Sequence, residues 1–226
     1  MEGSRRSGER VAGRITPASG RYGGRTAAER QAERRRRLLE AGLELFGAGP
    51  GYRGTTVTAL SQAAGLSTRQ FYEEFRTLED LLAELHLQVN DVAEQTVLAV
   101  LPELDDLDPI DRYTAMFRAY AAGITGDPRH TRIAFVEIIG VSPRLDEQRL
   151  ARRARWVDFL CAQADAAVAR GELAPRDYRL AATAFIGSIN GLMHDWAVGW
   201  VEASLDQVVD ELLHMLLGVL RAPAGE

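Results

Sequence analysis

The sequence predicts an all-α protein in which a small N-terminal domain of three helices precedes a larger helical bundle. Apolar residues recur three and four positions apart along most of the chain, which is typical of helices with one buried face. No stretch alternates as a half-buried strand does, and glycine or proline separates the helical segments. In the second half these separations lie at residues 102–109, 126–128, 140–143, 171–175 and 199–203.

Composition narrows the class of protein. The 226 residues are 46% hydrophobic, enough to bury one good core and a smaller second one. Cys161 is the only cysteine, which excludes an internal disulfide and a cysteine-based zinc cage, so we expect a protein of the reducing cytoplasm. No apolar segment is long enough for a signal peptide or a membrane span, so we expect no membrane partner.

Charge is distributed unevenly along the chain. Residues 1–76 hold 14 arginines against 8 glutamates, a net charge of +6, although the whole chain carries a net charge of -5. Because local positive charge releases counterions from nucleic acid, this pattern predicts phosphate contact in the N-terminal third alone.

We divide the chain into residues 1–25, 26–76 and 77–221. Residues 1–25 are rich in Gly, Ser and Arg with few apolar side chains, which predicts a flexible basic arm. This arm either follows the minor groove of DNA or is an inert solvated tail. Residues 26–76 form the small domain, and residues 77–221 form the bundle.

The first helix is predicted to begin at a capping box and to end at glycines. Thr26 and Glu29 have the spacing in which a threonine hydroxyl and a glutamate satisfy each other's backbone amides. Leu38, Leu45 and Phe46 belong to one apolar stripe, and the glycines from Gly47 onward stop the helix. The arginines at 34–37 are expected on the solvated side, with a phosphate contact as the alternative.

Two short helices then follow with a tight turn between them. Thr55 or Thr56 can cap the first, and Gly65 ends it with the positive φ that such a turn requires. Ser67 and Gln70 form a second capping box, and Thr77 caps the next helix. This layout predicts a helix-turn-helix, whose second helix presents its first residues to the major groove.

The exposed residues at the start of that second helix are the candidate base readers. Arg69 can pair with guanine O6 and N7, and Gln70 can pair with adenine N6 and N7. Ser67 and Thr68 can reach bases or phosphates. Arg76 is a phosphate candidate by its position and charge.

Residues 38–82, about a fifth of the chain, resemble the DNA-binding domain of the TetR family of transcriptional regulators. The elements that carry the resemblance occur in the family's order: an apolar helix ending in Phe46, a glycine-rich loop to Thr55-Thr56, the run Ala63-Ala64-Gly65-Leu66-Ser67, the aromatics Phe71, Tyr72 and Phe75, and Glu79-Asp80-Leu81-Leu82. The family usually has lysine where this chain has Leu78, so Arg76 or Arg53 would have to supply the phosphate contact of that lysine.

The resemblance implies further contacts and a dimer. It implies phosphate contacts from Thr55, Thr56 and Tyr72; alternatively the threonines only cap a helix and Tyr72 is core. It also implies that the last two helices, residues 177–200 and 205–220, form a homodimer that reads a pseudo-palindromic DNA operator. Small residues between 184 and 191 would let a partner helix approach closely, or they pack within one subunit.

The bundle is expected to hold a small apolar or aromatic effector. The candidate pocket residues are Phe117, Tyr120, Phe135, Trp156, Phe159, Asn190 and His194. Aromatic residues at helical spacing are equally typical of plain core. The function that we expect is therefore a DNA-binding repressor released by a small molecule. The alternative is a ligand-independent repressor whose C-terminal domain only dimerises or binds a protein partner.

An enzyme is not expected. Glu211 and His214 have the Glu-x-x-His spacing of four-helix di-iron proteins, but that site needs a second such pair, which this sequence lacks. Phosphate-binding glycine loops and nucleophile motifs are also absent from the sequence. We accordingly predict no catalytic residue, no metal and no cofactor.

Overall fold

The computed structural model describes residues 26–221, and within this range it is helical without any strand, which confirms the all-α prediction. The helices are α1 (Ala27–Gly47), α2 (Val57–Ala63), α3 (Thr68–Glu74), α4 (Leu78–Val100), α5 (Pro109–Thr125), α6 (Pro128–Arg132), α7 (Pro143–Ala169), α8 (Arg179–Ala197) and α9 (Leu205–Arg221). A 3-10 turn, η1 (Leu101–Glu103), follows α4, and a π-helical turn, η2 (Ile133–Glu137), follows α6. The predicted arm at residues 1–25 lies outside the described residues.

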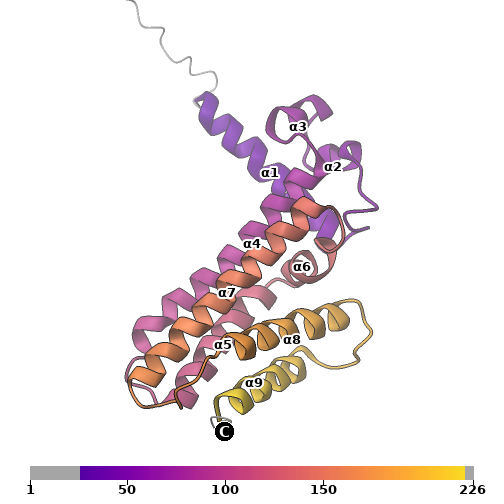
Figure 1. Cartoon of the computed structure of the whole chain (residues 1–226). Helices are drawn as coiled ribbons and strands as arrows, with labels where there is room; N and C mark the ends of the chain where they lie inside the picture. Colours follow the sequence, from indigo (N-terminus) through magenta and orange to yellow (C-terminus); the bar gives the residue numbers. More distant parts are fainter. Residues whose placement is uncertain (1–25, 222–226) are drawn as a thin grey trace, which may run out of the picture.

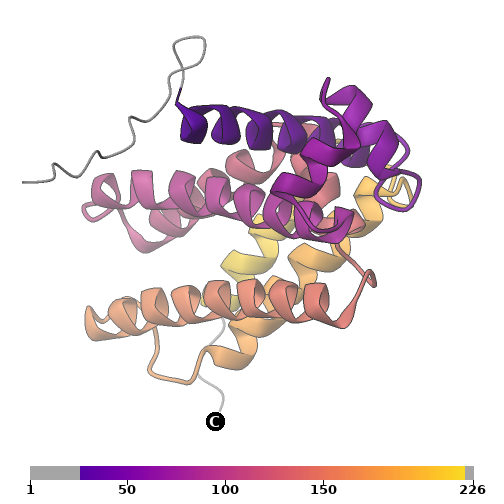
Figure 2. The same cartoon turned by 90° about the horizontal axis from the view of Figure 1, so that it is seen from above.

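The molecule has a small head and a larger body. Helices α1, α2 and α3 form the head at one end, and α4 runs from the head down into the body (Figure 1). Helices α8 and α9 pack side by side at the end of the body farthest from α3. Seen from above, α4 and α5 lie between α1 on one side and α7 on the other (Figure 2).

The three helices of the head and α4 begin at the predicted caps. The Thr26 and Ser67 hydroxyls accept from Glu29 N and Gln70 N, and both capping boxes are complete. Thr77 caps α4, and Thr56, rather than Thr55, caps α2. Each such cap contributes about 1 kcal/mol to helix stability.

Two glycines in the head are required by the backbone. Gly65 ends α2 with φ of 62°, a conformation that side chains with a Cβ rarely adopt. At Gly47, the last residue of α1, a Cβ would lie 2.6 Å from Arg129 Cβ, so only glycine lets α6 come this close.

The cores of head and body are continuous. Phe46, Leu60, Phe71 and Leu81 are fully buried where α1 to α4 meet, and the same apolar cluster extends through α4 and α5 to α8 and α9. Because α4 contributes to both cores, it joins the head to the body.

Candidate DNA-binding surface and ligand cavity

The third helix buries its aromatic side and exposes its polar side. Phe71 and Phe75 lie in the core of the head, whereas Thr68, Arg69 and Arg76 are exposed. Tyr72 is 60% exposed, so it does not belong to the core. The solvated side of α3 therefore carries hydroxyl and guanidinium groups that can donate to DNA.

Ser67 and Gln70 are tied to each other. Gln70 Oε1 accepts from Ser67 N at 3.0 Å, and Ser67 Oγ accepts from Gln70 N at 3.2 Å. Paired recognition of adenine requires a glutamine oxygen that can accept from N6. Gln70 would have to leave the capping box to read adenine in this way. Arg69 takes no part in the capping box, and its side chain is 89% exposed.

The two threonines before α2 differ in exposure. Thr56 is exposed, and its hydroxyl accepts from Ala59 N at 3.2 Å. Thr55 is buried, and its hydroxyl donates to Gly51 O at 2.8 Å. Of these two threonines, only Thr56 presents its side chain at the surface.

Two arginines expected in solvent instead anchor α3 to α1. The Arg34 Nε and Nη2 atoms lie 3.1 and 2.9 Å from Glu74 Oε1, and the Glu74 side chain is fully buried. Arg35 donates to Glu74 O at 2.8 Å, and its guanidinium lies 4.2 Å from the centre of the Phe75 ring. The predicted solvated arginine face was therefore wrong for these two residues, because the end of α3 lies against it.

Glu73 and Glu74 place two negative charges on α3, and they differ in exposure. Glu74 points away from the exposed side of α3 and is paired with Arg34. Glu73 is about half exposed and lies 3.4 Å from Arg69 Nε, one helical turn away. This exposed ion pair is weak and holds the Arg69 side chain only loosely.

A buried carboxylate joins the head to the body. Glu137, at the end of η2, accepts from Tyr52 N at 2.7 Å and from Arg132 Nε at 2.8 Å. The neighbouring Gly51 has φ of 82°, and a Cβ there would lie 2.9 Å from Glu137 Oε1. The loop before α2 thus closes around a side chain of the body, a contact for which the sequence offered no motif.

Two further arginines of the body bind acidic residues of the neighbouring helices. Arg129 in α6 contacts Glu40 and Glu44 of α1 at 3.0 and 3.1 Å. Arg144, at the start of α7, lies 2.8 Å from Glu79 at the start of α4. Hydrogen bonds from Ser142 and then Arg144 lower the pKa of Glu79.

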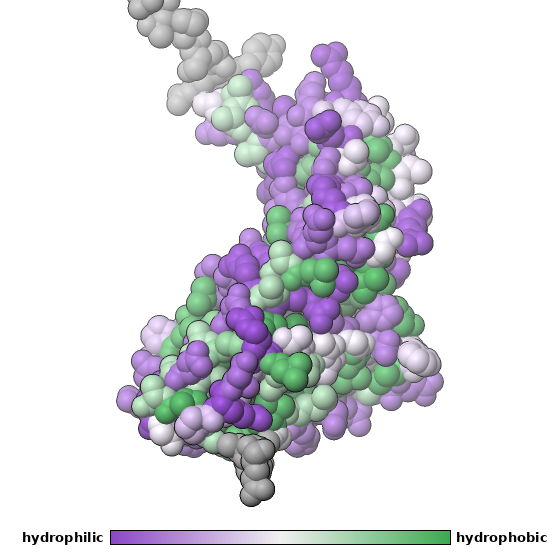
Figure 3. Space-filling view, viewed as in Figure 1, coloured by the Kyte–Doolittle hydropathy of each residue, from purple (hydrophilic) through white to green (hydrophobic). Residues whose placement is uncertain are grey.

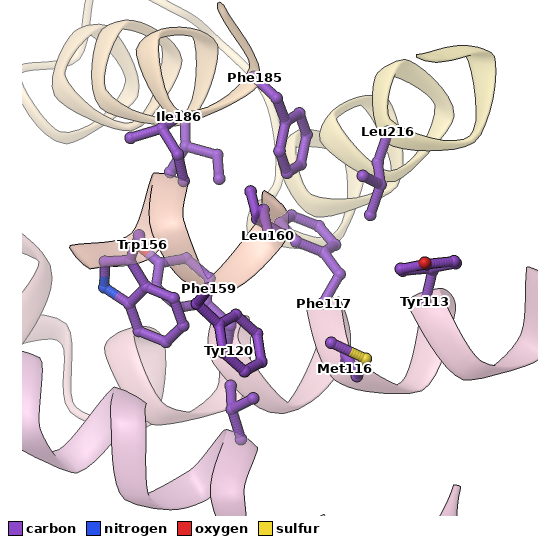
Figure 4. Close-up of a pocket in the computed structure, with 12 residues that line it drawn as sticks. Tyr113, Met116, Phe117, Tyr120, Trp156, Phe159, Leu160, Phe185, Ile186 and Leu216 are labelled. Carbon is purple, nitrogen blue, oxygen red and sulfur yellow. The ribbon is translucent and has the colours of Figure 1, made fainter. Parts of the chain in front are cut away.

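An apolar cavity lies among α4, α5, α7, α8 and α9 (Figure 4). Its lining residues are Val97, Tyr113, Met116, Phe117, Tyr120, Trp156, Phe159, Leu160, Phe185, Ile186, Ile189 and Leu216. Figure 4 shows the rings of Tyr120, Trp156 and Phe159 gathered at one side and those of Phe117 and Phe185 at the other. The free space is small, with room for about three water molecules.

The structure brings five of the seven candidate pocket residues together. Phe117, Tyr120, Trp156 and Phe159 line the cavity, and Phe135 lines an adjoining one that shares Phe117 and Tyr120. Asn190 and His194 line neither of these cavities. Asn190 donates to Ile186 O on its own helix at 2.8 Å, and His194 lies 3.0 Å from its neighbour Asp195.

The outer side of α8 is open. A Cβ at Gly191 would meet no atom within 4 Å, and one at Gly187 would meet only the end of the Arg153 side chain. Packing within one subunit therefore does not explain these small residues. Apolar residues are more frequent on the lower half of the molecule, where α7 to α9 face the viewer, than over α1 to α3 (Figure 3).

Metal and membrane features are missing from the described part of the chain. Residues 26–221 contain no group of three side chains that could hold a metal ion, and Glu211 and His214 are both exposed on α9. None of the described helices is long and apolar enough to cross a membrane.

The helix-turn-helix head and the helical body together define a DNA-binding transcriptional regulator. The family model for bacterial regulatory proteins of the tetR family matches residues 38–85. The model for the tetracyclin repressor-like C-terminal domain matches residues 106–220, about half of the chain. The chain therefore belongs to the TetR family of transcriptional regulators, whose members bind operator DNA and dimerise.

Solved structures share the fold at low sequence identity. The fatty acid degradation regulator FadR from Bacillus halodurans is 17% identical with a TM-score of 0.68, covering 84% of this chain and 97% of its own. FadR from Bacillus subtilis in complex with stearoyl-CoA is 15% identical with a TM-score of 0.67, covering 84% and 99%. AibR in complex with isovaleryl coenzyme A and operator DNA is 23% identical with a TM-score of 0.60, covering 80% and 97%. No curated protein matches the sequence.

Proposed function

We propose that this regulator is a repressor that binds a pseudo-palindromic operator as a homodimer and leaves it when a small apolar molecule enters the cavity. The observation that carries the proposal is the physical link between the cavity and the head. Phe135 and Glu137 lie in the same turn, η2; Phe135 lines a cavity and Glu137 bonds to Tyr52 N beside the DNA-binding helices. A ligand that moves this turn changes the position of the head.

Exposure guides the assignment of DNA contacts. Arg69 is the principal base reader, and Ser67 and Thr68 lie at the same end of α3. Tyr72, Thr56 and Arg76 contact the phosphates on either side. Thr55 is secondary because it is buried, and Gln70 is secondary because the oxygen that it needs for adenine accepts from Ser67 N.

The dimer interface is assigned to the outer sides of α8 and α9. The open surface at Gly187 and Gly191 supports this assignment, because a partner helix can approach closely where no Cβ intervenes. A two-fold pair places two α3 helices in successive major grooves, about 34 Å apart.

The cavity supports an apolar effector. Its lining is almost wholly aliphatic and aromatic, and two of the similar structures are complexes with acyl-coenzyme A molecules. Because the free space is small, an effector can bind only if the helices around the cavity move apart.

The second candidate function is ligand-independent repression, and the small free space of the cavity favours it.

The first experiment measures binding to DNA upstream of the chain's own gene by fluorescence anisotropy, at two salt concentrations. Loss of a paired arginine–guanine contact costs about 1–3 kcal/mol, so Arg69→Ala should weaken specific binding about tenfold or more and leave salt-sensitive background binding. Arg118→Ala removes an exposed arginine of α5 that pairs with Asp210, and it is the matched control. Equal binding by both variants would contradict the assignment of Arg69.

A further inference from the structure

The apolar cavity continues to an opening between α4 and α7. A second cavity shares Val97, Trp156 and Phe159 with the first, so the two adjoin. Its remaining lining residues, Glu94, Leu98, Arg152 and Arg155, include three charged side chains. One continuous space thus passes from a lining of aromatic and aliphatic groups to one of guanidinium and carboxylate groups.

Helices α4 and α7 are joined here by ion pairs more than by apolar packing. Arg152 donates to Glu94 Oε2 at 2.9 Å and also to Asp91, and its side chain is only 9% exposed. Arg155 lies 2.5 Å from the same Glu94, but its side chain is 61% exposed. Arg155 is therefore the guanidinium that can turn to another anion, because an exposed ion pair of this kind is worth little.

A buried histidine of α4 faces α7 and its arginines. The Nδ1 atom of His86 lies 3.2 Å from Gln148 Nε2 of α7. Burial and then the charges of Arg152 and Arg149 lower the pKa of His86 to about 4. At the second cavity itself, Arg152 is committed to Asp91 and Glu94, which leaves Arg155 as the exposed guanidinium.

An uncommitted hydrogen-bond donor lies between the two cavities. The indole N–H of Trp196 donates to Ala203 O at 3.0 Å, whereas that of Trp156 has no hydrogen-bond partner within residues 26–221. Trp156 lines both cavities and is only partly buried, so its N–H is accessible and can donate to a molecule that lies there. A ligand that passes from one cavity to the other can supply this acceptor.

We propose that the effector is an amphipathic anion, with its apolar chain among Phe117, Tyr120 and Phe159 and its anionic head at the α4–α7 opening beside Arg155 and Trp156. This inference rests on the proposed function, because it specifies the chemistry of the molecule that would release the repressor from DNA. A hydrogen bond to a charged group makes the head selective, and the chain supplies the apolar contact.

The test compares probes of equal chain length by isothermal titration calorimetry, below the concentrations at which they form micelles. Dodecanoate should bind the full-length dimer about tenfold more tightly than dodecanol or dodecylamine, in keeping with one charge-assisted contact. Dodecanoyl-coenzyme A distinguishes a free carboxylate from a head that carries phosphates.

Two variants assign the contacts to residues. Arg155→Gln should reduce the tenfold preference for dodecanoate to less than threefold and leave dodecanol binding unchanged. Trp156→Phe keeps an aromatic ring but removes the N–H, and it should weaken the binding of dodecanoate more than that of dodecanol. Arg118→Gln, at a residue that pairs with Asp210 and lines neither cavity, should change neither the preference nor the binding of dodecanol. Thermal unfolding confirms that each variant is folded.

The outcomes separate this inference from the proposed function. If dodecanol or dodecylamine binds as tightly as both anionic probes, or if Arg155→Gln keeps the preference, the assignment of an anionic head is overturned. If an anionic probe binds as expected but leaves the affinity for the operator unchanged, the proposed effector class is supported and ligand-induced release is contradicted. If only an uncharged probe releases the protein from the operator, ligand-induced release is supported and the anionic effector is contradicted.

Discussion

At the scale of single residues, the structure separates side chains that the sequence presents as equivalent. Thr55 and Thr56 are adjacent and chemically identical, yet one hydroxyl is buried against Gly51 and the other caps α2 at the surface. Arg34 and Arg69 are both arginines of the head, yet Arg34 neutralises the buried Glu74, whereas Arg69 is exposed and pairs only loosely with Glu73. Burial, which depends on neighbours distant in sequence, decides these roles.

His86 predicts a pH dependence of stability. Its pKa of about 4 in the folded protein lies below the ordinary value of 6.5, so the unfolded chain binds a proton that the folded chain does not. Stability should therefore fall as the pH decreases below 6.5, by about 2 kcal/mol between pH 7.5 and pH 5 from this group. Urea unfolding of His86→Gln should show a smaller loss over this interval than the natural protein does. The exposed His214 is the control, and an equal loss in His86→Gln would exclude His86 as the source.

At the scale of elements, η2 links the cavity to the head. Replacing Glu137 with alanine removes the acceptor of the partly buried N–H of Tyr52, which should cost about 1 kcal/mol of unfolding free energy. Urea unfolding should show this loss, whereas Glu211→Ala on the exposed side of α9 should not.

Glu137→Ala should also weaken the response to an effector. The change in operator affinity on adding the effector should be smaller in Glu137→Ala than in the natural protein. A full effector response in Glu137→Ala would show that other contacts, such as those of Arg129 or Arg144, link the cavity to the head.

At the scale of the whole molecule, a large residue on the outer side of α8 tests the proposed dimer interface. Gly191→Leu should leave the subunit folded, because no atom lies within 4 Å of the added Cβ, but it should force a partner helix away. Overpacking costs about 1–3 kcal/mol, so the dissociation constant of the dimer, measured by sedimentation, should rise about tenfold or more. Ala162→Leu, on the exposed side of α7, is the matched control. A dimer that persists unchanged in Gly191→Leu would place the interface elsewhere.

Local sequence rules determined the secondary structure of the head. The capping boxes at Thr26 and Ser67, the cap at Thr77 and the turn at Gly65 all involve residues within a few positions of one another. Such interactions depend on the backbone nearby, so a sequence pattern suffices to predict them. The division of the chain at residue 76 remains a prediction, since α4 packs into both head and body.

Contacts between residues far apart in the chain were decided by the tertiary structure alone. Glu137 meets Tyr52, Arg34 meets Glu74, and Arg152 meets Asp91 and Glu94, across sequence separations of 40 to 85 residues. The aromatic residues of the cavity were predictable as a set of apolar helix positions, but their opening toward Arg155 was not. Helical periodicity tells which side of a helix is buried; the partner that buries it, and the charge that lies beside it, depend on how the helices pack.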